Sequence, residues 1–129
     1  MPDYLDTSAF LKLVRSEPES RALRAEMTIG DALVSSALLL VEGRRAASRY
    51  GALALARARA ALSTVTLLAI DDQTLETAAG LEPPELRSLD ALHLAAALSL
   101  AGDLGRVYCY DARLAAAASA LGLDVRQPR

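Results

Sequence analysis

Short apolar runs alternate with longer amphipathic stretches along this chain, which predicts strands alternating with helices. Strands are predicted over residues 4–5, 32–34, 65–70 and 106–110, with a last edge strand at 123–125, because these runs are short and rich in β-branched, aliphatic or aromatic residues. Helices are predicted over residues 9–14, 18–27, 37–50, 52–62, 72–80, 89–101 and 112–121, where polar, Pro or Gly residues mark the starts and ends.

This alternation is typical of the α/β class, with a central, mostly parallel sheet of four to five short strands flanked by about seven helices. The 129 residues contain no linker, repeat or low-complexity segment apart from Ala-rich helices, so a single domain over residues 1–129 is expected. Hydrophobic residues make up 53% of the chain but aromatic residues only 4%. The core is therefore expected to consist of Leu, Ala and Val.

Serines precede two of the predicted helices. Ser35 and Ser36 lie before the helix over residues 37–50, and Ser88 lies before the helix over residues 89–101. A serine hydroxyl at such a position accepts a hydrogen bond from a free N–H group in the first turn. These serines are therefore expected to cap the two helices.

Four acidic residues fall where the sheet and its helices would bring them together. Asp6 and Asp111 each follow a predicted strand, and the carboxyl ends of parallel strands are where ligands bind in open α/β sheets. Glu42 lies within the helix over residues 37–50, and Asp90 lies in the first turn of a later helix. If both helices pack against that edge, the four carboxylates converge.

Each acid also has a purely structural explanation. Asp6 and Asp111 are suitable N-caps, and Asp90 is favoured in a first turn by the helix dipole. Glu42 is able to pair with a nearby arginine on its own helix. It follows the apolar run Leu38–Val41, however, which is expected to be largely buried, and a carboxylate beside buried apolar residues must be paired or metal-bound.

Carboxylates that share a pocket need a compensating positive charge. An all-oxygen ligand set favours Mg²⁺ or Mn²⁺, which can activate water for hydrolysis of a phosphodiester. The single cysteine, Cys109, excludes an intramolecular disulfide and a cysteine-based metal site. No Ser-His-Asp order, phosphate-binding glycine loop or zinc motif offers a competing chemistry.

Motifs around these acids resemble the PIN-domain nucleases, and most closely the VapC-type toxins of bacterial type II toxin–antitoxin pairs. The matching segments are Tyr4-Leu5-Asp6-Thr7-Ser8, Val41-Glu42, Arg87-Ser88-Leu89-Asp90-Ala91-Leu92-His93, Tyr110-Asp111-Ala112-Arg113-Leu114 and Ala120-Leu121-Gly122-Leu123. Their order and spacing cover nearly the whole chain, which makes the set specific although the first segment alone is weak.

The resemblance implies a PIN-like fold and a Mg²⁺- or Mn²⁺-dependent endoribonuclease, a hydrolase that uses metal-activated water. It also implies a homodimer and inhibition by a cognate antitoxin protein. The four acids would be both the catalytic residues and the metal ligands, and Thr7 or Ser8 would support them through a carboxylate or a bound water. One departure is Cys109, at a position where the family often has Thr or Ser; it leaves a supporting hydrogen bond open to question.

Two residues of the third motif have alternative readings. Arg87, three residues before Asp90, is a candidate to hold a substrate phosphate or is an ordinary surface arginine. His93, one turn after Asp90 on the same helix face, borders the site or is a packed, hydrogen-bonded structural histidine, and the latter is the more common situation.

The net charge of −2 gives no overall attraction to RNA, so binding requires a local basic surface. The candidate, which is equally consistent with an ordinary solvated surface, comprises Arg44, Arg45, Arg49, Arg57 and Arg59. With few aromatic residues for stacking, a structured RNA such as tRNA or rRNA is the expected substrate.

The helices over residues 37–50 and 52–62 carry more apolar residues than one buried face needs. Leu38, Leu39, Leu53 and Leu55 are in excess, and some are expected to contact a second subunit or the antitoxin. A secretory signal and a membrane-spanning run are both missing, so a soluble cytoplasmic protein is expected.

Two other classes of protein were weighed. A non-catalytic PIN-fold interaction module is the alternative function, although such a module has no physical reason to keep four repelling carboxylates together. A phospho-accepting receiver domain needs a lysine late in the chain, and the only lysine is Lys12. This last class is therefore excluded.

Overall fold

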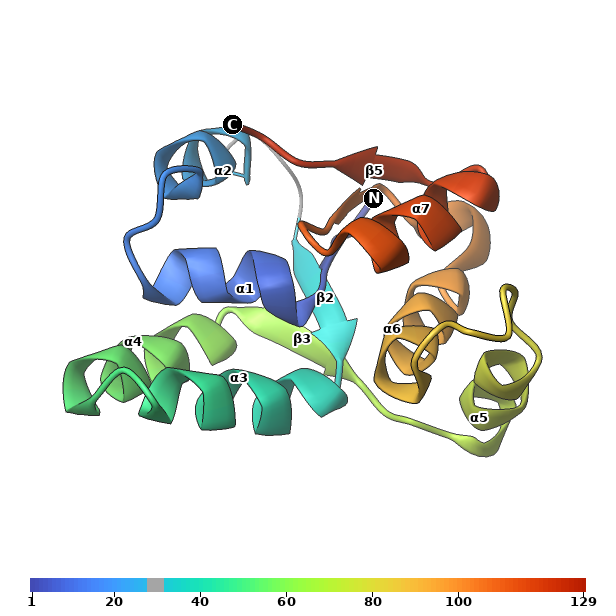
Figure 1. The fold of residues 1–129 in the computed structure, drawn as a ribbon, viewed down its shortest axis with the longest axis horizontal. Helices are drawn as coiled ribbons and strands as arrows, with labels where there is room; N and C mark the ends of the chain where they lie inside the picture. The colour runs from blue at the N-terminus through green and yellow to red at the C-terminus, as the bar shows by residue number, and fades with distance from the viewer. Residues whose placement is uncertain (28–31) are drawn as a thin grey trace.

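The computed structural model describes residues 1–27 and 32–129 and shows strands and helices in alternation (Figure 1). The strands are β1 (Asp3–Leu5), β2 (Leu33–Ser36), β3 (Val65–Leu68), β4 (Arg106–Tyr108) and β5 (Asp124–Arg126). The α-helices are α1 (Thr7–Val14), α2 (Ser20–Met27), α3 (Leu38–Ser48), α4 (Ala52–Leu62), α5 (Asp72–Ala79), α6 (Ser88–Leu98) and α7 (Ala112–Ala120), and a 3₁₀ turn, η1 (Ala101–Asp103), precedes β4. The predicted α/β class is confirmed.

The five strands form one sheet in the order β3-β2-β1-β4-β5, and every neighbouring pair is parallel. β1 is the central strand, and Leu5 at its end pairs with Tyr108 at the end of β4. The residues that follow β1 and β4 therefore leave the sheet at the same edge. Among the helices of the described ranges, none is long and apolar enough to cross a membrane.

Helices cover both faces of the sheet. Figure 1 shows α1, α3 and α4 on one side of the strands and α6 and α7 on the other. Because successive side chains of a strand point to opposite faces, Tyr4 and Leu5 of β1 enter different cores. Leu5 packs with Phe10 and Leu39 in the first core, whereas Tyr4 packs with Leu94 in the second.

Of the predicted capping serines, Ser36 alone bonds to the first turn of its helix among the described contacts. Ser35 and Ser36 belong to β2, where the Ser35 hydroxyl donates to the Leu5 carbonyl at 2.7 Å, although Ser36 still accepts from the Leu38 N–H at 3.1 Å. Ser88 is the first residue of α6, and the N-cap position is held by Arg87, whose side chain makes no cap bond. The pairing of β2 with β3 extends the strand through both serines, which the short apolar run did not reveal.

The prediction that the run before Glu42 is buried was wrong. Leu39 is fully buried, but Leu40 and Val41 are 39% and 55% exposed. The run is helical, so only the face of α3 that packs on α1 and α4 is covered. The expected surplus of apolar residues on α3 and α4 is present at Leu53, which is 65% exposed, while Leu38 and Leu55 are half-buried.

Candidate functional site

Asp6 and Asp111 lie at the same edge of the sheet, each just beyond the end of its strand. Asp6 caps α1, because its Oδ1 accepts from the Ala9 N–H at 2.9 Å and from the Ser8 hydroxyl at 2.6 Å. Asp111 caps α7 in the same way, with the N–H groups of Arg113 and Leu114 both 3.0 Å from its Oδ1. Both residues are therefore N-caps, which was the structural explanation that the sequence offered for them. The Oδ2 atom of each takes no part in the cap and makes other contacts.

Cys109 links these two acids. Its thiol donates to Oδ2 of Asp6, 3.1 Å away, and lies 3.5 Å from the Asp111 carbonyl oxygen. Burial raises the pKa of Cys109 and keeps the thiol protonated as a donor. The family often has a Thr or Ser hydroxyl at this position, and here the Cys109 thiol makes the supporting hydrogen bond to Asp6 instead.

Asp6 is the most deeply buried of the four acids, with 3% of its surface exposed. Burial raises its pKa, although hydrogen bonds from Ser8, the Ala9 N–H and Cys109 oppose this shift. Its carboxylate is held in fixed orientation but is poorly solvated when ionised. Such a group gains from a nearby cation.

Glu42 reaches the same edge from α3. Its Oε1 accepts from the Thr7 hydroxyl at 2.6 Å and lies 2.7 Å from Nε2 of His93. Burial by itself would raise the pKa of Glu42, but the bonds to His93 and Thr7 outweigh burial and lower it. Glu42 is thus an ionised carboxylate although only 22% of its side chain is exposed.

His93 and Tyr4 extend this contact into the second core. His93 is 2% exposed and Tyr4 is 1% exposed. The Tyr4 hydroxyl lies 2.7 Å from Nδ1 of His93, and the two rings meet edge to face. His93 is therefore a buried, hydrogen-bonded histidine, as its structural interpretation predicted. It also contacts Glu42, one of the four candidate acids.

Asp90 and Asp111 share one arginine. The Arg87 guanidinium donates from Nε to Oδ2 of Asp90 at 3.1 Å and from Nη2 to Oδ2 of Asp111 at 3.3 Å. The Asp90 side chain is 13% exposed and the Asp111 side chain 29%, whereas that of Arg87 is 64% exposed. The hydrogen bond to Asp90 and the charges of Asp90, Asp111 and Glu42 raise the pKa of Arg87.

The structure thus connects the four acids, although by way of intervening groups. In the described ranges no three His, Cys, Asp or Glu side chains stand close enough together to bind a metal as they are. Instead, Arg87 supplies the positive charge between two of the acids. Neither this bridge nor the part played by Tyr4 was predicted from the sequence, although a buried tyrosine hydroxyl usually has a hydrogen-bond partner.

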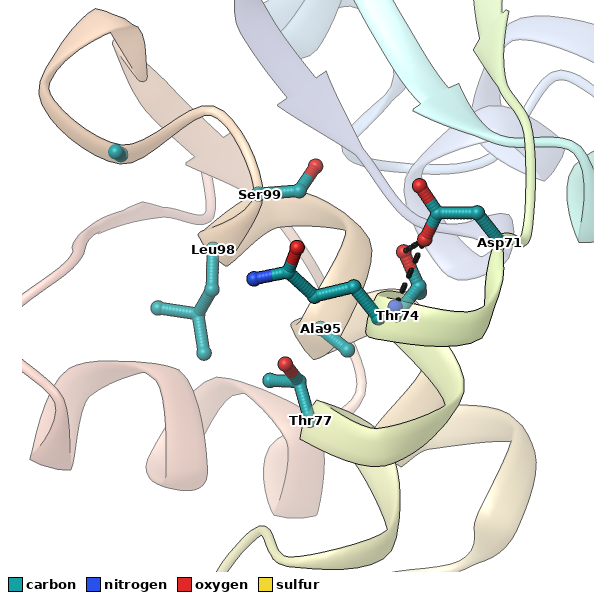
Figure 2. Close-up of a pocket in the computed structure, with 8 residues that line it drawn as sticks. Asp71, Thr74, Thr77, Ala95, Leu98 and Ser99 are labelled. Carbon is teal, nitrogen blue, oxygen red and sulfur yellow. Dashed lines mark hydrogen bonds between the residues drawn. The ribbon is translucent and has the colours of Figure 1, made fainter.

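A separate cavity of about 410 Å³ lies between α5 and α6 (Figure 2). Its one carboxylate among the described lining residues, Asp71, accepts at Oδ1 from the N–H and the hydroxyl of Thr74 and so caps α5. None of the four candidate acids lines it. The sheet edge therefore stays the candidate site.

The five arginines of the predicted basic surface are all exposed on α3, α4 and the turn between them. α3 also carries Glu42, so this surface and the acidic cluster share an element. Tyr50, in the same turn, is 50% exposed. The Arg15 guanidinium stacks on its ring, with the guanidinium carbon 3.7 Å from the ring centre.

Similarity to known proteins agrees with the fold and the order of the motifs. The family model described as "PIN domain" matches residues 4–124. Among curated proteins, "Ribonuclease VapC46" of Mycobacterium tuberculosis is 47% identical over 97% of this chain and 96% of its own length. "Ribonuclease VapC47" of the same species is 37% identical with the same coverage.

A solved structure is similar over nearly its whole length. The crystal structure of Mycobacterium tuberculosis VapC20, described as a toxin that cleaves the sarcin–ricin loop, superposes with a TM-score of 0.75. The match covers 98% of this chain and 99% of VapC20 at 18% sequence identity. At this identity the similarity concerns the fold.

Proposed function

This chain belongs to the PIN-domain family, and from that premise we propose that it is an endoribonuclease that acts as the toxin of a toxin–antitoxin pair. The curated relatives are named ribonucleases, and the chain spans almost their entire length. The proposed reaction is hydrolysis of RNA phosphodiester bonds by one domain, residues 1–129, in the cytoplasm where its substrate is found.

The observation that carries this proposal is the connected set of acids at one sheet edge. Asp6 and Asp111 follow adjacent parallel strands, and Cys109 contacts both of them. Glu42 accepts a hydrogen bond from Thr7, the residue after Asp6. Asp90 and Asp111 are connected through Arg87, which donates to both. We assign the catalytic and metal-binding roles to Asp6, Glu42, Asp90 and Asp111.

The donor set fits a hard divalent cation, Mg²⁺ or Mn²⁺. All four side chains offer carboxylate oxygens, the ligands that such ions prefer. A guanidinium already bridges Asp90 and Asp111, which supports the view that this pair attracts positive charge. These four acids would hold the ion, which would supply charge neutralisation and activate water for attack on a phosphodiester.

The protein's own groups would orient the reactants. Thr7 and His93 hold Glu42 ionised, so its carboxylate would be available as a metal ligand. Ser8 and Cys109 fix the two oxygens of Asp6. If a cation replaced its guanidinium at Asp90 and Asp111, Arg87 would be free to donate to a phosphate oxygen, which is the role that we propose for it.

A structured RNA, such as tRNA or rRNA, is the proposed substrate. Glu42, Asp90 and Asp111 are partly exposed, so a bulky polynucleotide has access to them. The exposed arginines of α3 and α4 would contact phosphates of the RNA. The Tyr50 ring is already covered by Arg15, so recognition of shape and phosphates is favoured over base stacking.

We also propose a homodimer and a cognate antitoxin protein as partners. Exposed apolar side chains on α3 and α4 offer a surface for one of these contacts: Leu40, Val41 and Leu53. The exposure of Leu53 supports this assignment, since burying its side chain against a partner would gain hydrophobic free energy.

The direct test is RNA cleavage by the purified chain and by Asp6→Asn and Asp90→Asn. Both variants keep the size of the side chain and, at Asp6, the capping oxygen. We expect cleavage that needs Mg²⁺ or Mn²⁺, stops with a chelator, and is lost in both variants while their circular dichroism spectra remain unchanged. Metal-dependent cleavage that persists in both variants would overturn the assignment. An intact chain that binds no metal at millimolar concentration would point to a non-catalytic interaction module.

A further inference from the structure

A chain of buried hydrogen bonds runs from the second core to Glu42. Tyr4 of β1 and His93 of α6 are nearly inaccessible to solvent. The Tyr4 hydroxyl is 2.7 Å from Nδ1 of His93, and Nε2 of the same ring is 2.7 Å from Oε1 of Glu42. Three elements distant in sequence are thereby joined behind one candidate ligand.

The neighbouring donors and acceptors fix the direction of each bond. The Thr7 hydroxyl gives its single proton to Oε1 of Glu42 at 2.6 Å. Nε2 of His93 therefore faces two acceptors, Oε1 of Glu42 and Oγ1 of Thr7, the latter at 3.2 Å, and must carry a proton.

The other ring nitrogen is set by Tyr4. The Tyr4 oxygen accepts from the Ser36 N–H at 3.1 Å, so its own proton is free to be donated. Nδ1 of His93 lies 2.7 Å away and, when it carries no proton, is the acceptor. The pattern Tyr4 O–H to Nδ1, then Nε2–H to Glu42, satisfies every group in the chain.

We propose that His93 is a positioning residue, locked by Tyr4 in the Nε2–H tautomer, that holds Oε1 of Glu42 and presents Oε2 to the metal and substrate. In the described ranges Oε1 receives both hydrogen bonds and Oε2 receives none. This inference rests on the proposed metal role of Glu42. It assigns to Tyr4 and His93 a function that a merely packed pair does not have.

Outer hydrogen-bond partners of a metal-binding side chain typically alter metal affinity by about 10- to 100-fold when they are removed. His93→Leu deletes the donor to Glu42, whereas His93→Gln keeps an amide N–H that can reach Oε1. Tyr4→Phe deletes only the hydroxyl that orients the ring. The matched control is Tyr108→Phe, because Tyr108 is equally buried, lies in the adjacent strand and belongs to the other core.

The first measurement is calorimetric titration of Mn²⁺ into each protein, together with kcat, KM and the midpoint of thermal unfolding. We expect His93→Leu to weaken Mn²⁺ binding by about tenfold and to lower kcat more than it changes KM. We expect His93→Gln to stay within about threefold of the unmodified chain, and Tyr108→Phe to change only the unfolding midpoint. Equal Mn²⁺ affinity in the unmodified chain and in folded His93→Leu would overturn the proposal and leave His93 a structural residue.

The second measurement reads the tautomer directly. His93 is the only histidine of the sequence, so a long-range ¹H–¹⁵N correlation spectrum of the untagged chain at neutral pH contains one imidazole. We expect an unprotonated Nδ1 and a protonated Nε2, and a change in the Nδ1 resonance in Tyr4→Phe. A protonated Nδ1 would overturn the proposal.

The two measurements separate this inference from the proposed function. If the unmodified chain binds no Mn²⁺ and cleaves no RNA, the proposed function fails, while the spectrum still reports whether Tyr4 fixes the tautomer. If the unmodified chain binds Mn²⁺ and His93→Leu binds it equally well, only the positioning role fails.

Discussion

The two halves of the acidic cluster are held in opposite ways. Glu42 is fixed from inside the protein, by Thr7 and by a histidine that is 2% exposed. Asp90 and Asp111 are instead bridged from the solvent side by Arg87, whose side chain is 64% exposed. Buried hydrogen bonds hold Glu42, whereas an exposed cation that is able to leave holds the Oδ2 atoms of Asp90 and Asp111.

This difference follows from burial. When a buried hydrogen bond is broken, the group that remains is buried without a partner, and this costs its desolvation free energy. Such contacts therefore resist displacement. An ion pair at the surface competes with water and salt and contributes little net stability. The buried half is therefore expected to set the geometry of the site, and the exposed half to exchange its cation for metal and substrate.

The largest effect is expected at the buried half. Glu42→Gln keeps an oxygen that accepts from Thr7 and His93 but removes the negative charge. We expect RNA cleavage to fall by at least about 100-fold, while the midpoint of thermal unfolding changes little. Cleavage assays with a matched thermal melt check this, and near-normal activity would place Glu42 outside the chemistry.

Asp6 gives a pH-dependent effect on stability. Burial raises the pKa of Asp6 above its ordinary value of 3.8, so its ionised form destabilises the fold. This cost is present above the folded pKa, diminishes as pH falls through it, and disappears below the unfolded value. We expect metal-free Asp6→Asn to melt about 4 °C higher than the unmodified chain at pH 7, equivalent to about 1 kcal/mol.

The advantage of Asp6→Asn should vanish as the pH approaches 3.8. Thermal melts of both proteins in the presence of a chelator, from pH 7 downwards, provide the comparison. A variant that is less stable at neutral pH would mean that the hydrogen bonds from Ser8 and Cys109 outweigh the burial of the charge.

At the exposed half, removal of Arg87 is expected to have two smaller effects, tighter metal binding and weaker RNA binding. Arg87→Ala removes the cation that competes for Asp90 and Asp111, so Mn²⁺ should bind about threefold more tightly. The same variant loses a phosphate contact, so the KM for RNA should rise about fivefold. Arg113→Ala is the control, because Arg113 contacts Asp111 only through its backbone N–H among the contacts of the described ranges. Unchanged Mn²⁺ affinity in Arg87→Ala would show that the bridge does not compete with metal.

The smallest effect is expected at Cys109. Cys109→Ser keeps a donor to Asp6, whereas Cys109→Ala removes it. Because a thiol is a weak donor, we expect activity within about twofold for Cys109→Ser and a loss of about threefold for Cys109→Ala. Steady-state kinetics with both variants decide this, and equal activity of the two would assign the thiol to packing.

The fold class could be predicted from the sequence because it depends on local patterns and chain order, and the site role of the four acids stays a prediction made on the same grounds. Strand ends mark Asp6 and Asp111, and alternation of strands with helices implies a parallel sheet. The sequence predicted Glu42 for a partly mistaken reason, since Leu40 and Val41 beside it are exposed. Its hydrogen-bond partners are instead Thr7 and His93, which lie 35 and 51 residues away along the chain.

Other features required the three-dimensional structure. The Arg87 bridge joins Asp90, three residues away, to Asp111, 24 residues away, and only the packing of α6 against α7 brings them together. The bond from Cys109 to Asp6 spans 103 residues and depends on the pairing of β1 with β4. Spacing rules describe neighbours on one element and do not describe contacts of this kind.

The most direct test of a single metal site with one fixed and one exchangeable half is a crystal structure with Mn²⁺, read by anomalous scattering. We predict a manganese peak among Asp6, Glu42, Asp90 and Asp111, with Glu42 still bonded to His93 and with Arg87 moved away from both of its partners. A saturated crystal with no peak at these four carboxylates, or with the Arg87 bridge intact beside a bound ion, would contradict the account.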